Sequence, residues 1–307
     1  MSDAALPGLV VASHGRHCLV ETPDGARRLC HARGKKNETV VGDRVLWRPT
    51  GDEGVIAGVQ PRRNLFHRQD EVRTKSFAAN LDQVLVLIAA EPEFSEMQLA
   101  RALIAAEAER IQPLVALNKS DLVEPFERAW GRLRPYLHMG YGVLPLSLRL
   151  SKDVDRDHLL QHLQGRTTLV LGPSGAGKST LINLLVPQAQ ALTGEISQAL
   201  NSGKHTTTAT TWYWVDDARE TALIDSPGFQ EFGLHHIDRM QLASLMPDLR
   251  AHVPGCRFYN CTHLHEPGCG VIAAVADTPA PPADRIAPSR YRIYRTLFEE
   301  LSQPTRY

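Results

Sequence analysis

The sequence has no long hydrophobic run, no export signal and no net charge. None of its apolar stretches approaches the ~18 residues that a membrane-spanning helix requires, so we expect no membrane segment. The first residues, MSDAALPGLVVASHGRH, lack a basic segment followed by a long apolar core, so we expect a cytoplasmic protein without a secretory signal. The formal net charge is +0, so the bulk electrostatics favour no particular kind of partner.

Cysteine is scarce and unevenly distributed. The chain has five cysteines, an odd number, and three of them (Cys256, Cys261 and Cys269) lie close together near the C-terminus. In a chain without an export signal, such clustering favours a metal site over disulfides. The other two, Cys18 and Cys30, are expected to be small buried side chains.

Residues 8 to about 70 consist of short apolar segments separated by turns. These segments are GLVVAS, HCLVET, ARRLCHA, VVGDRVLW and GVIAGV, and the pair Asp24-Gly25 is typical of a hairpin turn. Five short strands in this length of chain predict a small β-barrel of the OB-fold type.

The same part of the chain is locally basic. From Arg16 to Lys75 there are thirteen Lys and Arg against eight Asp and Glu. A solvated surface explains this excess as well as nucleic-acid binding does. If RNA binds here, the cationic side chains near the end of the barrel are the candidates for phosphate contacts, namely Arg62, Arg63, His67 and Arg68.

From about residue 76, buried strands alternate with helices. The apolar run Leu81–Ala90 is typical of a parallel strand that is buried on both faces. Ser95 is expected to cap a helix, because Gln98 follows at the spacing of a capping box. Further strands are predicted at 113–117, 143–146, 167–171, 212–215 and 221–224, with helices near 124–137, 157–163 and 179–185. This alternation predicts a doubly wound α/β domain.

After about residue 235 no further strands are predicted. The cysteine cluster and a Pro-rich linker, TPAPPADRIAP, precede a helix expected over 289–301. The predicted fold is therefore a multidomain α/β protein, with an OB-fold β-barrel (1–75), a central P-loop α/β domain (76–234) and a C-terminal α-helical metal-binding module (235–307).

The segment GPSGAGKST matches the phosphate-binding pattern G-x-x-x-x-G-K-[ST]. Its glycines let backbone N–H groups turn toward phosphate oxygens, and the helix that follows points its positive end at the same phosphates. Lys178 is expected to reach the β- and γ-phosphates, and the Ser179 hydroxyl to bind Mg²⁺. The predicted nucleotide-binding residues here are Gly172, Pro173, Ser174, Gly175, Ala176, Gly177, Lys178, Ser179 and Thr180.

The segment NKSD indicates which base is bound. It follows the strand predicted at 113–117, at the carboxyl end where α/β proteins bind ligands. Guanine presents two donors, N1–H and the 2-amino group, which one carboxylate accepts together, whereas adenine has no such pair. We predict that Asp121 binds guanine and that Asn118, Lys119 and Ser120 complete the base-binding loop.

The segment DSPG follows the strand predicted at 221–224. Asp225 is expected to hold Mg²⁺ through water, and the N–H of Gly228 to meet the γ-phosphate. One threonine of GKHTTT, Thr207 by preference among 206–208, is expected to bind Mg²⁺ together with Ser179 only while GTP is bound. This behaviour is that of a switch segment.

The residue that orients the attacking water is less evident. Ras-type enzymes place a Gln directly after the glycine of this last motif, but Phe229 occupies that position here and cannot orient water. His205 is the preferred candidate for the catalytic residue. Gln230 is one position out of place, and a partner that supplies the missing group is the remaining alternative.

The cysteine cluster has the spacing of a structural zinc site. Cys256, Cys261 and Cys269 provide three thiolates, and one imidazole would close the tetrahedral shell. His263 and His265 compete for this fourth position, with His263 preferred.

Together these elements resemble the bacterial family of small-ribosomal-subunit-dependent GTPase A. NKSD precedes the phosphate loop, whereas it follows it in Ras-like chains, and such a circular permutation is typical of this family. The resemblance also includes VVGDRV, GKHTTT, DSPGF and the run that ends in EPGC. It implies an OB-fold, a circularly permuted P-loop GTPase domain and a zinc-binding module with the ligands Cys256, Cys261, His263 and Cys269. It also implies that the catalytic histidine is His205.

The resemblance further implies a partner and a role. The family binds the small (30S) ribosomal subunit and its rRNA, acts late in subunit maturation, and hydrolyses GTP to GDP with stimulation by the subunit. We expect one structural Zn²⁺, Mg²⁺ with GTP, and a monomer. The sequence departs from the family pattern at Lys204 (usually Arg), in DSPG (more often DTPG) and at Ser147-Leu148 (usually Ser-Ala).

Two other interpretations are weaker. A transporter-type ATPase would carry LSGGQ and a strand ending in Asp-Glu, which this sequence lacks, and NKSD would have no role. A non-enzymatic RNA-binding protein that uses GTP as a structural ligand is conceivable because of Phe229, and measuring turnover separates it from a GTPase.

Overall fold

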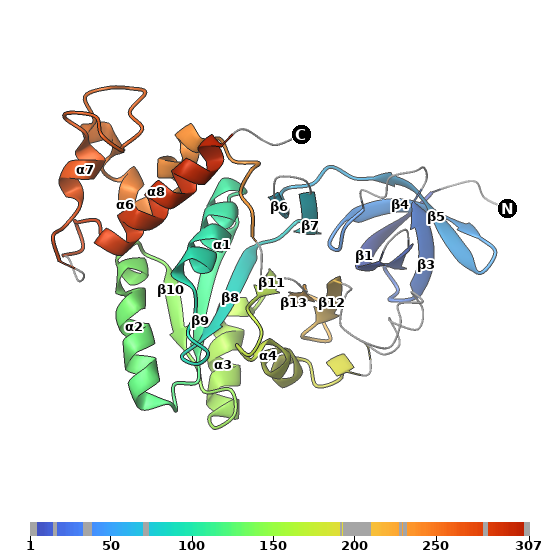
Figure 1. Cartoon of the computed structure of the whole chain (residues 1–307). Helices are drawn as coiled ribbons and strands as arrows, with labels where there is room; N and C mark the ends of the chain where they lie inside the picture. Colours follow the sequence, from blue (N-terminus) through green and yellow to red (C-terminus); the bar gives the residue numbers. More distant parts are fainter. Residues whose placement is uncertain are drawn as a thin grey trace.

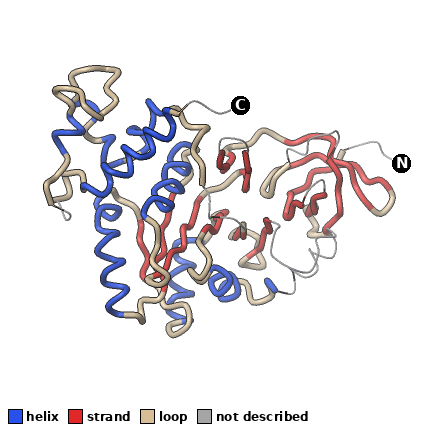
Figure 2. The backbone as a smooth tube through the Cα atoms, viewed as in Figure 1, coloured by secondary structure: helices blue, strands red, loops and turns tan. Residues whose placement is uncertain are grey.

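The computed structural model describes residues 5–14, 17–32, 39–69, 74–190, 192, 210–226, 229, 232–278 and 282–303. An all-strand N-terminal part is followed by alternating strands and helices, and then by a C-terminal part of helices and loops (Figures 1 and 2). The multidomain α/β fold class predicted from the sequence is confirmed. None of the helices in the described ranges combines the length and apolar character that crossing a membrane needs.

The N-terminal strands close into a small barrel. Its strand order is β1-β2-β3-β5-β4, and β4 pairs back with β1, as in the predicted OB-fold. Inward-facing side chains fill the interior, among them Cys18 and Cys30, which are fully buried as expected. The strands are β1 (Leu6–His14), β2 (His17–Glu21), β3 (Arg27–Ala32), β4 (Arg44–Thr50) and β5 (Glu53–Val59).

A two-stranded ribbon that the sequence analysis did not anticipate follows the barrel. It pairs β6 (Leu65–Gln69) with β7 (Thr74–Ala79), and its apolar contribution is mainly Phe66 and Phe77. Because polar and charged residues fill most of the other positions, the ribbon gives no long apolar run to detect. The predicted boundary between residues 75 and 76 lies within β7, and the proposed domain limits stay predictions.

The central sheet has the order β10-β9-β8-β11-β13-β12. All neighbours in it are parallel except β12, which runs antiparallel to β13. The strands are β8 (Gln83–Ala89), β9 (Gln112–Asn118), β10 (Gly142–Pro145), β11 (Thr167–Leu171), β12 (Thr210–Trp214) and β13 (Ala222–Asp225). The helices of this part are α1 (Glu96–Ala108), α2 (Val123–His138), α3 (Lys152–Leu163) and α4 (Lys178–Leu185).

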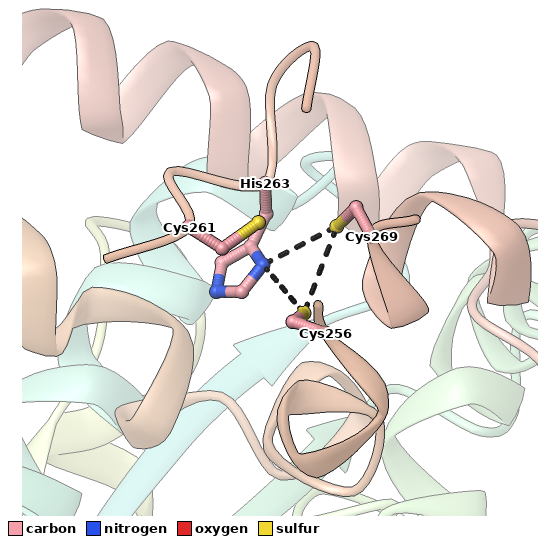
Figure 3. Close-up of side chains that lie close together, drawn as sticks. All are labelled: Cys256, Cys261, His263 and Cys269. Atoms are coloured by element: carbon pink, nitrogen blue, oxygen red, sulfur yellow. Dashed lines mark hydrogen bonds between the residues drawn. The ribbon is translucent and has the colours of Figure 1, made fainter. Parts of the chain in front are cut away.

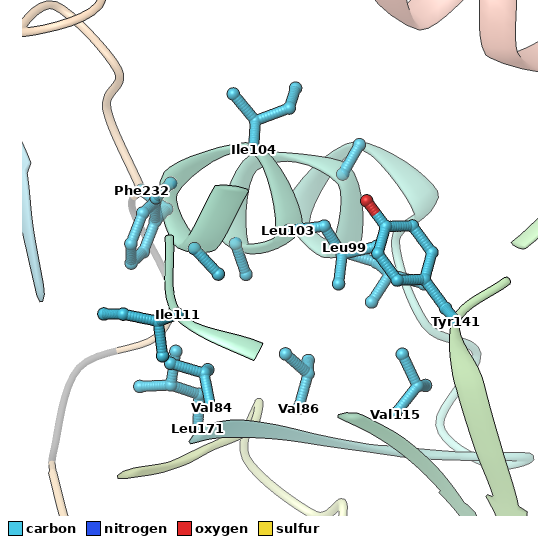
Figure 4. Close-up of a cluster of buried hydrophobic side chains, with 14 of the residues drawn as sticks. Val84, Val86, Leu99, Leu103, Ile104, Ile111, Val115, Tyr141, Leu171 and Phe232 are labelled. Atoms are coloured by element: carbon cyan, nitrogen blue, oxygen red, sulfur yellow. The ribbon is translucent and has the colours of Figure 1, made fainter. Parts of the chain in front are cut away.

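The sheet buries both faces, as its continuous apolar strands predict. Alternate residues of β8 enter different cores: Val84 and Val86 pack on the side of α1 and α2, and Leu85 and Leu87 on the side of α3 and α4. Figure 4 shows Leu99 and Leu103 of α1 pointing toward the strands, with Ile104 on the opposite side of the helix. Ser95 caps α1 as predicted, accepting the N–H of Gln98 at 3.3 Å.

The C-terminal part packs against α1 and α2. It contains η1 (Arg239–Leu245), α6 (Pro247–Arg250), η2 (Val253–Gly255), α7 (Gly270–Ala274) and α8 (Pro288–Ser302). Arg101 of α1 donates to Glu300 of α8 at 2.8 Å and to the backbone oxygen of Phe232 at 3.2 Å. One guanidinium therefore contacts both α8 and the segment that follows the DSPG motif.

The barrel and the central sheet are continuous. β1 pairs with β12 through Ala12–Thr211 and Ser13–Thr210, which makes a single eleven-stranded sheet. Next to this pairing, the buried carboxylate of Glu21 accepts the indole N–H of Trp214 at 2.7 Å. The barrel is thus attached to the β12–β13 hairpin by backbone pairing and by a buried polar contact.

Candidate nucleotide site and metal centre

The phosphate-binding loop connects β11 to α4, as the motif requires. Gly175 and Gly177 have φ of +80° and +104°, a backbone conformation that L side chains rarely adopt. A Cβ on Gly177 would lie 2.4 Å from Nδ2 of Asn118, and a Cβ on Gly172 would lie 2.5 Å from the oxygen of Leu87. Glycine is therefore required here by both backbone conformation and close packing.

The lysine of this loop contacts the DSPG segment. The Lys178 ammonium pairs with the Asp225 carboxylate at the end of β13 and donates to the Ser226 oxygen at 3.1 Å. Ser179, in the first turn of α4, is an exposed residue. The hydroxyl and carboxylate that Mg²⁺ prefers therefore come from two segments that Lys178 holds together.

The base-binding loop is tied to the phosphate-binding loop through Asn118. Its side chain is 5% exposed, and Nδ2 donates to the Ala176 oxygen at 2.8 Å. Its Oδ1 accepts the backbone N–H of Lys119 at 2.8 Å and that of Leu148 at 3.2 Å. Lys119 has a φ of +68°, which turns the chain sharply at the end of β9. Asn118 therefore fixes the distance between the two loops.

Asp121 is oriented by the Ser147-Leu148 segment. The Ser147 hydroxyl donates to Oδ1 of Asp121 at 2.7 Å. The Ser147-Leu148 segment, which is usually Ser-Ala in the family that the sequence resembles, therefore lies beside the proposed guanine-binding carboxylate. The backbone N–H of Ser147 donates in turn to Oδ2 of Asp155 at 2.6 Å.

Sequence reasoning did not identify Asp155. It expected a helix near 157–163, whereas α3 begins at Lys152, so Asp155 lies in the first turns of a helix and not in a loop. The available signal was an acidic residue eight positions after Ser147.

Several predicted switch residues lie outside the described residues, namely His205, Thr207, Gly228 and the alternative Gln230. Phe229 is described and is 3% exposed. Its ring packs 6.4 Å from that of Phe232, in the cluster that also contains Phe66 and Phe77. The position that carries a Gln in Ras-type enzymes therefore belongs to the hydrophobic core.

Cys256, Cys261, His263 and Cys269 converge in the C-terminal part (Figure 3). The Cys256 Sγ–Cys269 Sγ distance is 3.8 Å, and Nδ1 of His263 lies 3.4 Å from each of these sulfurs. In a tetrahedral zinc site with ordinary bond lengths, ligand atoms lie about 3.5–3.8 Å apart. The cluster could therefore hold zinc. His265 is exposed and is not part of it.

Several hydrogen bonds support the loop that carries His263. His263 has a φ of +59°, and its backbone oxygen accepts the Tyr291 hydroxyl at 2.8 Å. Glu266 accepts the backbone N–H of Thr262 at 2.8 Å and that of Leu264 at 3.2 Å. Although burial opposes it, hydrogen bonds from the Thr262 hydroxyl and from the backbone N–H groups of Thr262 and His265 hold the pKa of Glu266 well below its ordinary value. Burial lowers the pKa of His263, which favours the neutral imidazole that a metal ligand requires.

Two of the basic residues suggested for phosphate contacts have other partners. Arg62 pairs with the fully buried Asp43 at 2.7 Å, and Arg63 pairs with Asp82 at 2.8 Å. The ring of His67 packs 4.2 Å from that of His236. Arg62, one of the residues suggested for phosphate contacts, therefore holds the barrel loop that contains Asp43.

Comparisons with known proteins agree on one family. The model of the RsgA GTPase family matches residues 59–235. The chain is 73% identical over 296 residues to "Small ribosomal subunit biogenesis GTPase RsgA" of Variovorax paradoxus (strain S110), which covers 96% of this chain and 92% of the relative. It is 51% identical over 310 residues to the protein of the same name from Paraburkholderia phytofirmans, covering 99% and 96%.

Solved structures give the same result. YjeQ from Thermotoga maritima matches with a TM-score of 0.73 and 28% identity, over 98% of this chain and 100% of that one. YloQ, described as a circularly permuted GTPase, matches with a TM-score of 0.70 and 25% identity, over 99% and 98%.

Proposed function

Because the chain belongs to the RsgA GTPase family and is accordingly a GTP hydrolase of small-subunit biogenesis, we propose that it acts late in 30S maturation and that the subunit stimulates its hydrolysis of GTP to GDP and phosphate. The observation that best supports GTP as the substrate in this proposal is the connection between the two nucleotide loops. Asn118 joins the base-binding loop to Ala176 of the phosphate-binding loop, and Ser147 orients Asp121. A guanine base and a phosphate chain can therefore be recognised together.

In this proposal each motif has a distinct task. Asp121 accepts both guanine donors, and the backbone N–H groups of 172–180 hold the phosphates, with Lys178 neutralising their charge. Ser179 and Thr207 would hold Mg²⁺, and Asp225 would bind it through water. When bound, the ion would neutralise charge on the β- and γ-phosphates.

His205 is proposed to orient the attacking water, and the N–H of Gly228 to meet the γ-phosphate. Because Phe229 is buried at the position that carries the catalytic Gln in Ras-type enzymes, its burial supports a catalytic residue from another position. His205→Ala should abolish subunit-stimulated hydrolysis while GTP affinity is retained. If hydrolysis were unchanged, the assignment to His205 would be wrong.

The Cys256, Cys261, His263 and Cys269 cluster is proposed to bind one structural zinc ion. Its ligands come from loops between short helices, so the ion would bind segments that have little secondary structure of their own. The three thiolates and one imidazole leave no open position, which suits a structural and not a catalytic role.

The small ribosomal subunit and its rRNA are the proposed partners. The barrel supports this assignment because OB-folds bind nucleic acid through one face of the barrel. We further propose that the protein acts in the cytoplasm, where it would meet this partner, and that it is a monomer.

The decisive experiment is GTP and ATP turnover by the purified protein, with and without small ribosomal subunits. The proposal expects slow turnover of GTP alone that rises sharply when subunits are added. GTP turnover that does not respond to subunits would contradict the proposed stimulation, and comparable ATP turnover would contradict the role of Asp121.

A further inference from the structure

Asp155 is a buried carboxylate whose hydrogen bond is to Ser147 and not to any predicted nucleotide-binding residue in the described ranges. It lies on α3 and is 6% exposed, and Oδ2 accepts the backbone N–H of Ser147 at 2.6 Å. Burial raises its pKa, so a charge is maintained here at a cost in free energy. The start of α3 offsets part of this cost, because the N-terminus of a helix favours negative charge.

The segment that Asp155 holds is fixed on both sides. Before it, Leu146 donates to the Leu117 oxygen and accepts the N–H of Ser120, both at 2.9 Å. At Ser147 itself, the backbone oxygen accepts the N–H groups of Leu150 and Ser151 at 2.9 Å. The Ser147 N–H donates to Asp155, so the peptide between Leu146 and Ser147 is held at its oxygen by Ser120 and at its N–H by the Asp155 carboxylate.

The orientation of this peptide affects both Asp121 and Asn118. The Ser147 hydroxyl donates to Asp121 at 2.7 Å, and the next N–H, from Leu148, donates to Asn118 at 3.2 Å. The Ser147 hydroxyl occupies one lone pair of Asp121 and limits the rotation of its carboxylate. A shift of Ser147 would release this carboxylate, which has to meet two guanine donors at once.

We propose that Asp155 is a positioning residue for guanine selectivity, which acts by holding Ser147 so that Asp121 presents both carboxylate oxygens to the base. This inference rests on the proposed function, in which Asp121 binds guanine. It assigns to Asp155 no contact with the nucleotide.

The test compares the dissociation constants of GDP and IDP by calorimetry. Inosine lacks the 2-amino group, so the ratio Kd(IDP)/Kd(GDP) measures the second hydrogen bond to Asp121. A hydrogen bond to a charged acceptor predicts a wild-type ratio on the order of 10- to 100-fold. In Asp155→Ala this ratio should fall to about threefold or less, because a loosely held carboxylate gains little from the second donor.

Matched variants separate positioning from general damage. Asp155→Asn keeps an oxygen that accepts the Ser147 N–H and should retain the wild-type ratio. Asp153→Ala removes an exposed carboxylate from the first turn of the same helix and should also retain it. Asp155→Ser, whose hydroxyl is too short to reach Ser147, provides a second truncation if the alanine variant does not fold.

Two results would overturn the inference. One is an unchanged ratio in both truncation variants, including an equal loss of GDP and IDP affinity, which indicates a purely structural role. The other is a wild-type protein that does not prefer GDP over ADP. That result overturns the proposed function as well, and so is distinguishable from the first.

Discussion

Arg290 of α8 forms an ion pair with Asp248 inside the C-terminal part and also contacts Tyr136 of α2. Its side chain is 2% exposed, and Nε lies 2.9 Å from Oδ2 of Asp248. Its Nη1 donates to the Tyr136 hydroxyl at 3.3 Å, and the guanidinium lies 4.8 Å from the centre of the Tyr136 ring. Burial opposes the charged form, but Asp248 and Tyr136 outweigh it and raise the pKa of Arg290 above its ordinary value.

Removing Arg290 leaves the largely buried Asp248 carboxylate without its cationic partner. Breaking a buried pair from one side costs about 3–5 kcal/mol, so Arg290→Met should lower the free energy of unfolding by that amount. Arg250 provides the control. Its pair with Glu107 spans 3.4 Å and its side chain is 54% exposed, so Arg250→Ala should cost only about 0–1 kcal/mol.

Urea unfolding and hydrogen exchange in α8 measure the effect. Exchange is needed because the parts of a multidomain chain need not unfold together. The double variant Arg290→Met/Asp248→Leu should recover most of the loss, since it removes the unpaired charge as well. The reasoning is refuted if Arg290→Met costs no more than Arg250→Ala, or if the double variant is less stable than the single one.

Three further changes have clear expected outcomes. Gly177→Ala should reduce GDP affinity at least about tenfold, since its Cβ would meet the side-chain nitrogen of the base-binding asparagine, whereas Gly131→Ala in α2, with open space around it, should bind GDP normally. Calorimetry checks this, and normal binding by the first variant would contradict it. His263→Ala should lose zinc and destabilise the C-terminal part, while His265→Ala should keep one zinc per chain by elemental analysis; equal zinc content would refute the ligand assignment. Burial lowers the pKa of His236 from 6.5 to about 4, so the unfolded chain binds the proton more readily and stability should fall as pH drops through this range. His236→Asn should reduce the loss of unfolding free energy between pH 7 and pH 5, measured by urea titration at each pH. An equal loss in the variant and the wild type would argue against this role of His236.

Most of the fold could be predicted from local patterns in the sequence. The continuous apolar runs predicted β8, β9 and β11, because strands buried on both faces need them. Patterns with polar interruptions were missed. Each strand of the β6–β7 ribbon has one buried phenylalanine among mostly polar neighbours, and α3 begins with the exposed residues Lys152, Asp153 and Val154, so neither gives a strong apolar period.

The nucleotide site and metal centre likewise have a part that the sequence predicts and a part that it does not. The P-loop, NKSD and the cysteine cluster could be identified because each is a short segment with its own chemistry. The bonds that organise them could not, because they join residues far apart in the chain. Asn118 and Ala176 are 58 positions apart, and Ser147 and Asp121 are 26 positions apart. The same limit applies to Arg62, which pairs with Asp43 and does not stay free for phosphate.

The pairing of β1 with β12 has a mechanical consequence. β12 and β13 form the hairpin between the Thr-rich segment and DSPG, the two segments expected to respond to the γ-phosphate. The barrel projects away from the central sheet (Figure 1), and its backbone pairing with the central sheet is through this hairpin. A rotation of β12 would therefore be passed to β1, and so to the barrel, through backbone hydrogen bonds and not through a flexible linker.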